Sequence, residues 1–71
     1  MKSVKEIETQ QVYLDHGYNY IVVFTDDYDC YETAHFKSRR SAEMFNENKL
    51  GNFGEVMTVH QAVKKYDFLE L

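Results

Sequence analysis

Residues 20–36 have the sequence YIVVFTDDYDCYETAHF. The β-branched and aromatic run YIVVF predicts the central strand of a sheet, over residues 18–25, with burial on both faces. Residues 26–29 (DDYD) predict a turn, because aspartate side chains accept hydrogen bonds from their own backbone. Residues 30–36 then return as a second strand. We therefore expect an antiparallel hairpin with an acidic tip.

The pairing register of this hairpin depends on the length of its turn. A loop with an even number of residues places the even-numbered residues of the first strand on the same face as the odd-numbered residues of the second. A loop one residue longer or shorter brings the even-numbered residues of both strands together. The sequence leaves both registers open.

Two shorter elements are expected before the hairpin. Residues 11–14 predict another strand, joined to the hairpin by a loop whose Gly17 can adopt the positive φ of a bulged turn. Residues 3–10 fit either a strand, because of their Val, Ile and Thr content, or a short helix, because Ser3 and Glu6 have the spacing of a capping box. We favour the helix.

A helix and a short strand are expected after the hairpin. Ser38 predicts the N-cap of a helix over residues 39–48, with Ala42 and Phe45 one turn apart on its buried side. Two glycines and an asparagine then end this helix. Residues 55–58 alternate as a short strand.

A last helix is expected to follow that strand. Thr58 and Gln61 form a second capping-box pair, and the helix runs from there towards Phe68. The element order is then β-β-β-α-β-α. It predicts an α+β fold, with a small antiparallel sheet of three to four strands and helices packed mainly on one face.

Length and composition predict one small domain over residues 1–71. A chain of 71 residues is too short for two cores. The longest apolar run, residues 20–24, is far shorter than the ~20 residues of a spanning helix, and residues near the N-terminus lack the apolar segment of an export signal. The single cysteine, Cys30, cannot form an internal disulfide, which suits a reducing compartment. We expect a cytoplasmic protein without membrane association.

The net charge of −4 is unevenly distributed. Residues 6–36 contain seven acids, five of the six tyrosines, and neither lysine nor arginine. Tyrosine provides a large, stiff contact area, and carboxylates attract a positively charged partner. We therefore expect a non-enzymatic protein–protein interaction module. Its expected partner is a protein with a basic surface, such as a nucleic-acid-binding enzyme, and its expected contacts are Asp26, Asp27, Tyr28, Asp29, Tyr31 and Glu32.

A simpler interpretation of this segment is that the tyrosines pack the sheet and the aspartates only solubilise a turn. Solvent exposure of the clustered tyrosines distinguishes the two interpretations, because buried rings belong to the core and exposed rings to an interface. A further alternative is a homodimer formed by the aromatic sheet face, since a domain of this size gains from additional buried area.

A basic cluster at the start of the second half provides an alternative function. Three bases and free backbone N–H groups would converge at the N-terminus of the helix that Ser38 caps, where an anion is favoured. This hypothesis is a small binder of a phosphate-bearing ligand such as a nucleotide, held by Lys37, Ser38, Arg39 and Arg40. Direct nucleic-acid binding is not expected, because one short basic cluster on an acidic chain offers too little positive charge to contact a phosphate backbone.

No metal, cofactor or catalytic site is expected. The acidic turn lacks the residue order and distal glutamate of a calcium loop. One cysteine and three histidines do not supply the ligand pairs of a zinc site. Cys30 and His35 are five residues apart on an expected strand and therefore on opposite faces, which argues against a thiol and a base acting together.

The hairpin of residues 18–36, the helix after Ser38 and the strand of residues 55–58 cover about half of the chain. In size, charge and order of elements, this layout resembles the small early proteins of bacteriophages that bind and inhibit a host or defence enzyme, including anti-CRISPR proteins and phage inhibitors of RNA polymerase. The resemblance implies an inhibitor or regulator of phage or bacterial origin.

Overall fold

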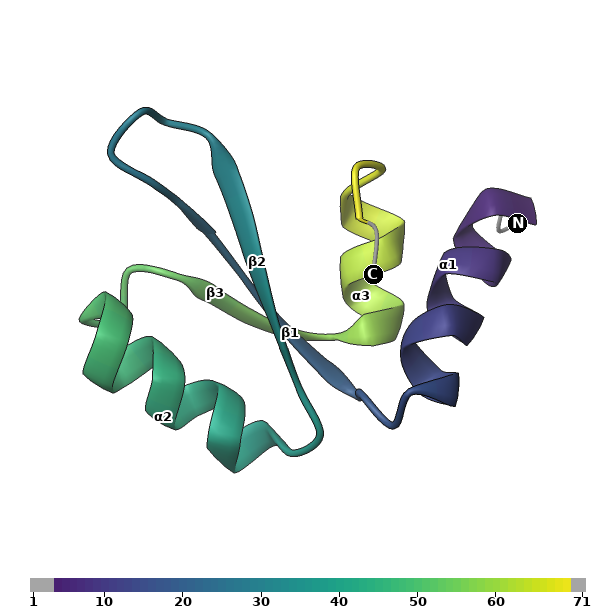
Figure 1. The fold of residues 1–71 in the computed structure, drawn as a ribbon, viewed down its shortest axis with the longest axis horizontal. Helices are drawn as coiled ribbons and strands as arrows, with labels where there is room; N and C mark the ends of the chain where they lie inside the picture. Colours follow the sequence, from purple (N-terminus) through teal and green to yellow (C-terminus); the bar gives the residue numbers. More distant parts are fainter. Residues whose placement is uncertain (1–3, 70–71) are drawn as a thin grey trace.

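The computed structural model describes residues 4–69 and shows three helices around a three-stranded antiparallel sheet (Figure 1). The strand order is β2-β1-β3, so that β1 is central and β2 and β3 are the edges. This confirms the predicted α+β class. In chain order, the elements are α1 (Val4–Asp15), β1 (Tyr20–Thr25), β2 (Tyr31–Phe36), α2 (Arg39–Leu50), β3 (Glu55–Thr58) and α3 (Val59–Lys65).

The two faces of the sheet are covered by different helices (Figure 1). Ile21 and Val23 point to one face, where they join the main core with residues of α1, α3 and β3. Val22 points to the opposite face, where α2 contributes the buried Ala42 and the ring of Phe45. Two of the three helices, α1 and α3, therefore share one face, as expected, and α2 covers the other. A central strand apolar on both sides requires cover on both.

The prediction of a strand over residues 11–14 is wrong, because these residues continue α1. The helix buries Tyr13, which is 1% exposed, in the main core. The helix ends at Asp15 and is followed by Gly17, whose φ of 85° is the left-handed conformation that closes a helix C-terminus. The backbone N–H groups of Gly17 and Tyr18 donate to the carbonyls of Leu14 and Tyr13, both at 3.0 Å. The favoured helix in the N-terminal segment is confirmed from Val4 onward, whereas Ser3 lies outside the described residues.

The hairpin of β1 and β2 has the register that places even-numbered residues of both strands on one face. Tyr20 pairs with Phe36, Val22 with Ala34 and Phe24 with Glu32. The loop is odd in length, because a backbone bond from Asp26 N–H to the Cys30 carbonyl (2.9 Å) closes it around three residues.

The helix ends after the hairpin are set by the predicted caps. Ser38 Oγ accepts a hydrogen bond from the backbone N–H of Ser41 at 3.2 Å and begins α2, which ends at Gly51 with a φ of 56°. Thr58 and Gln61 form the predicted capping box: Gln61 N–H donates to Thr58 Oγ1 (3.1 Å), and Thr58 N–H donates to Gln61 Oε1 (3.0 Å). Local hydrogen bonding therefore fixes where both helices start.

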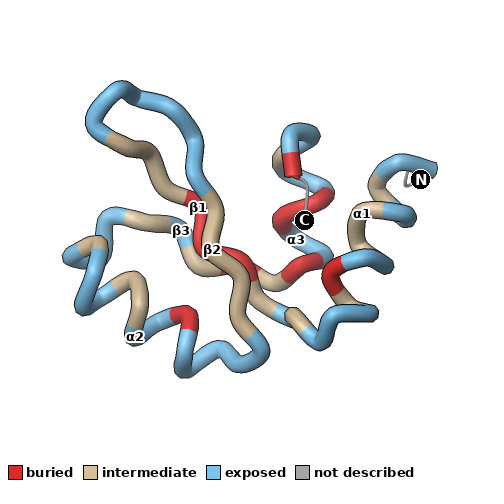
Figure 2. Tube along the Cα trace, in the orientation of Figure 1, coloured by how far each residue is buried: buried red, intermediate tan, exposed pale blue. Residues whose placement is uncertain are grey.

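The buried residues concentrate where β1 crosses between the helices, and the hairpin tip extends away from them (Figure 2). The core residues of the α1–α3 side are Tyr13, Ile21, Val23, Met57, Val59, Ala62, Val63 and Leu69. Within residues 4–69, no helix has both the length and the apolar character needed to cross a bilayer. The geometry leaves the acidic turn in solvent at the far end of the hairpin.

Candidate protein-binding surface

Asp26 builds the tip of the hairpin. Its Oδ1 accepts hydrogen bonds from the backbone N–H groups of Tyr28 (2.8 Å) and Cys30 (3.0 Å). The backbone N–H of Asp29 donates to the Asp26 carbonyl at 3.1 Å, and Asp29 has a φ of 60°, which aspartate tolerates better than most residues. Asp26 is therefore a turn-forming residue first, and its availability as a partner contact is reduced.

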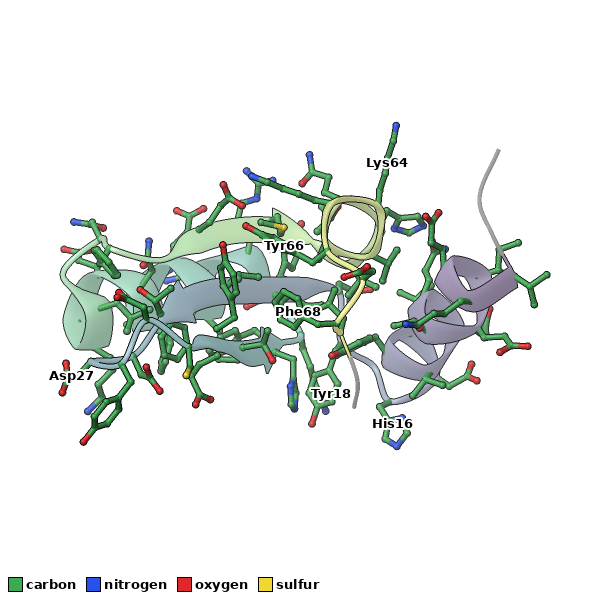
Figure 3. The ribbon with its side chains drawn as sticks, turned by 90° about the horizontal axis from the view of Figure 1, so that it is seen from above. His16, Tyr18, Asp27, Lys64, Tyr66 and Phe68 are labelled. Atoms are coloured by element: carbon green, nitrogen blue, oxygen red, sulfur yellow. The ribbon has the colours of Figure 1, made fainter. Side chains whose placement is uncertain are left out.

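The other acidic side chains at the tip are unpaired. Asp27, Asp29 and Glu32 are exposed, and among residues 4–69 their carboxylates have neither an ion pair nor a hydrogen bond. Figure 3 shows Asp27 at the extreme end of the molecule. Like charges that are left unpaired on a protruding turn create a local negative potential suited to a basic surface.

The tyrosines of the acidic segment divide into two groups. Tyr13 is buried, and Tyr18 and Tyr20 are half-buried against the two sheet faces. Tyr28 and Tyr31, by contrast, are 86% and 58% exposed. Tyr13, Tyr18 and Tyr20 therefore pack in the domain, as the simpler interpretation expects, whereas the exposed Tyr28 and Tyr31 belong to the predicted contact set.

An aromatic cluster, Tyr31, Tyr66 and Phe68, continues from the tip along the face of the sheet that α3 covers. Its ring centroids are 5.7 Å apart for Tyr31 and Tyr66, 5.2 Å for Tyr31 and Phe68, and 5.3 Å for Tyr66 and Phe68. Phe68 remains 41% exposed. Sequence reasoning missed Tyr66 and Phe68, for which the alternation of residues 66–68 was the only local signal. The cluster adds apolar contact area beside the acidic tip.

A polar group borders this cluster. Lys65 Nζ donates to Glu55 Oε2 at 2.8 Å, and the Tyr66 hydroxyl donates to Glu55 Oε1 at 3.2 Å. The hydrogen bond from Lys65 lowers the pKa of Glu55 below its ordinary value. Desolvation and the hydrogen bond to Glu55 raise the pKa of Tyr66 above its ordinary value, so its hydroxyl stays protonated and can donate to Glu55.

The basic cluster lies at the other end of β2 from the acidic tip. All four predicted residues, Lys37, Ser38, Arg39 and Arg40, are exposed. The Ser38 hydroxyl accepts a hydrogen bond from the Ser41 backbone N–H and donates one to Ser41 Oγ at 3.0 Å. The Arg39 guanidinium lies 5.5 Å from the centroid of the Tyr20 ring. Two of the four groups therefore have partners within the chain, and anion binding stays a prediction.

A groove runs between α1 and the C-terminal segment. Lys5 Nζ donates to the Asp67 carbonyl at 2.9 Å across it. One hollow of about 360 Å³ lies towards Val63, and a second of about 590 Å³ is lined by Val12 and Phe68 among others. The groove is open to solvent, and the lining residues that the structure describes bring together no set of groups with a recognisable chemistry.

The thiol and imidazole groups are held apart. Cys30 is exposed, with Sγ 3.8 Å from the Tyr28 carbonyl. The His35 ring lies on the other face of the hairpin, 4.2 Å from the Tyr18 ring centroid and 6.1 Å from that of Tyr13. In the described part of the chain, no three His, Cys, Asp or Glu side chains are grouped to hold a metal ion.

Comparison with known proteins gives no match to any family model, curated protein or solved structure.

Proposed function

We propose that this chain is a non-enzymatic protein–protein interaction module, which presents its acidic, tyrosine-bearing hairpin to a basic site on a protein partner. The observation that carries the proposal is the 86% exposure of Tyr28 at a turn with unpaired carboxylates on both sides. A ring so exposed contributes nothing to the core. Aromatic residues are enriched in interface hot spots, and an exposed tyrosine beside charges of one sign fits that role.

The carboxylates and the tyrosine at the tip would contribute to binding in different ways. The carboxylates of Asp27, Asp29 and Glu32 would steer the encounter and set a salt-dependent association rate. Tyr28, with the aromatic cluster behind it, would provide the area that is buried on binding and therefore the residence time. The turn is held by Asp26 before binding, so little ordering free energy is lost.

The layout shared with small phage proteins extends this proposal to an inhibitor or regulator that occupies the basic, nucleic-acid-binding site of a cytoplasmic enzyme. A carboxylate-bearing hairpin is chemically suited to such a site, because it presents negative charge where the nucleic acid presents phosphate. On this proposal, the chain competes with nucleic acid for the enzyme.

The experiment is affinity capture from a bacterial lysate with the immobilised chain, repeated at low and high salt. Two variants remove the proposed contacts without disturbing the turn: Tyr28→Ser and the double variant Asp27→Lys/Glu32→Lys. The control variant is Glu47→Lys, which reverses a charge on the exposed side of α2, outside the hairpin. We expect a basic protein that is retained by the wild type and by Glu47→Lys, lost at high salt, and depleted on both tip variants.

Two outcomes would contradict the proposal. One is the absence of any protein retained above a bare matrix. The other is a retained protein that binds the tip variants as well as it binds the wild type.

A further inference from the structure

The edge strand β2 has a free hydrogen-bonding side. The bond from Asp26 N–H to the Cys30 carbonyl, together with the register of the hairpin, directs the backbone groups of even-numbered β2 residues towards β1. The N–H and C=O groups of Tyr31, Thr33 and His35 therefore point away from the sheet. Within residues 4–69, these three residues make no backbone hydrogen bond outside the sheet.

The strand lacks the features that usually protect an edge. It has six residues with no proline, and Glu32 is its only residue with a formal charge at neutral pH. The other edge, β3, has only four residues, and its Glu55 is paired with Lys65. A long, weakly charged edge strand is suited to pairing with another strand.

Opposite charges lie at the two ends of this edge. The acidic tip (residues 26–29) precedes β2, and the basic residues Lys37, Arg39 and Arg40 follow it. A second copy of β2, laid antiparallel along the first, reverses this order. With Thr33 opposite Thr33, residue 31 faces residue 35 and Asp29 is aligned with Lys37, so that each acidic end meets the partner's basic end.

The side chains also match in this arrangement. Tyr31 and His35 lie on the same face of β2, because each is two residues from Thr33. Tyr31 belongs to the aromatic cluster, and His35 packs on Tyr18. In this pairing, Tyr31 of each copy would face His35 of the other, so the same contact would form at two places. Cross-strand aromatic pairs of this kind stabilise sheets. It would also cover part of Tyr31, which is 58% exposed in the single chain.

We propose that two copies of this chain pair through their β2 strands, antiparallel and about a two-fold axis, to form one continuous six-stranded sheet. The two-fold axis makes the contact closed, so that assembly stops at the dimer. A parallel arrangement would place like charges beside each other at both ends and is disfavoured. The dimer does not depend on the proposed function, because it uses the backbone edge of β2 and not Tyr28. The two surfaces share Tyr31 and the carboxylates of the acidic tip.

The first test removes one outward N–H from the edge. Thr33→Pro lacks this donor but leaves the bonds to β1 intact, since edge strands accept proline where the N–H faces solvent. Thr33→Val keeps the donor and the β-branched shape. In sedimentation across a dilution series, we expect the wild type and Thr33→Val to be dimers, and a folded Thr33→Pro to be a monomer. A monomeric wild type, or a dimeric Thr33→Pro, would overturn the proposal.

The second test exchanges the charges and remains informative if Thr33→Pro unfolds. One variant reverses the acidic end (Asp27→Lys/Glu32→Lys), and the other reverses the basic end (Lys37→Glu/Arg40→Glu). At low salt, each alone should dimerise at least about tenfold more weakly than the wild type, while an equimolar mixture should restore the dimer. A mixture no more dimeric than its separate components would contradict the charge pairing.

These tests also separate the dimer from the proposed function. Thr33→Pro keeps the tip and should still capture the basic partner protein, whereas Tyr28→Ser should keep the dimer and lose the partner. Loss of the dimer alone in Thr33→Pro and of the partner alone in Tyr28→Ser supports both proposals. A monomeric wild type that still captures the partner contradicts only the dimer, and a dimeric wild type that captures no partner contradicts only the proposed function.

Discussion

Replacement of Asp26 by alanine should loosen the hairpin tip. The change removes the Oδ1 atom that accepts from the Tyr28 and Cys30 N–H groups at 2.8 and 3.0 Å. A hydrogen bond contributes about 0.5–1.5 kcal/mol, and water can replace the acceptor at this solvent-facing turn, so we expect the free energy of unfolding to fall by about 1–2 kcal/mol. For a domain of this size, that corresponds to a decrease in Tm of roughly 4–15 °C.

The matched control is Asp26→Asn, which keeps an oxygen acceptor and removes only the charge. Urea and thermal unfolding followed by circular dichroism measure both variants. We expect Asp26→Asn to lose less than half as much stability as Asp26→Ala, because the hydrogen bonds and not the charge hold the turn. Equal losses in the two variants, or no loss in either, would refute this account of the tip.

Three further predictions concern the helix end, the sheet and the salt bridge. Gly17→Ala should lower the free energy of unfolding by about 1–2 kcal/mol, because a φ of 85° strains a residue with a Cβ, and urea melts measure it. Gly54→Ala should lower it by about 1–3 kcal/mol, because the new Cβ would lie 2.8 Å from the Val22 side chain; an unchanged urea midpoint would contradict this packing. The pKa of Glu55 is lower in the folded state than in the unfolded state. Its contribution to the free energy of unfolding is therefore complete above the unfolded-state pKa and is lost as the pH falls through the folded-state pKa. Wild type should therefore lose slightly more stability than Glu55→Gln in acid titrations, and parallel curves would argue against the pair with Lys65.

Local signals in the sequence predicted much of the fold. Ser38 and the Thr58–Gln61 pair were assigned correctly as caps, because capping is decided within four residues. The acidic turn was also predicted, since Asp26 bonds to its own neighbouring backbone. The open question of register was settled by the left-handed Asp29, which gives the loop its odd length.

The wrong assignments arose where distant contacts decide the structure. Residues 11–14 include the β-branched Val12 and the aromatic Tyr13, which suit a strand, and Gly17 at positive φ serves a hairpin or a helix C-cap equally well. Burial of Tyr13 against the core on α3 favours the helix, and this contact has no local signature. The position of α2 on the other sheet face likewise depends on contacts between residues far apart in the sequence.

The candidate surface was predicted in part. The sequence identified the hairpin and included Tyr28 and Tyr31 among the expected contacts, but it left open whether these rings are exposed. It also missed the contribution of Tyr66 and Phe68, which come from the far end of the chain and meet Tyr31 only in the folded state. Exposure and non-local clustering are properties of the tertiary structure, so neither can be derived from spacing.

The most direct test of the central claim is the affinity of the captured basic protein for wild type and for Tyr28→Ser, measured by calorimetric titration. Tyr28 is 86% exposed, so its truncation should leave the fold intact while removing the proposed hot spot. We predict a loss of affinity of about 30-fold or more, which corresponds to about 2 kcal/mol. An affinity for Tyr28→Ser equal to that of the wild type would contradict the claim that the hairpin tip is the binding surface.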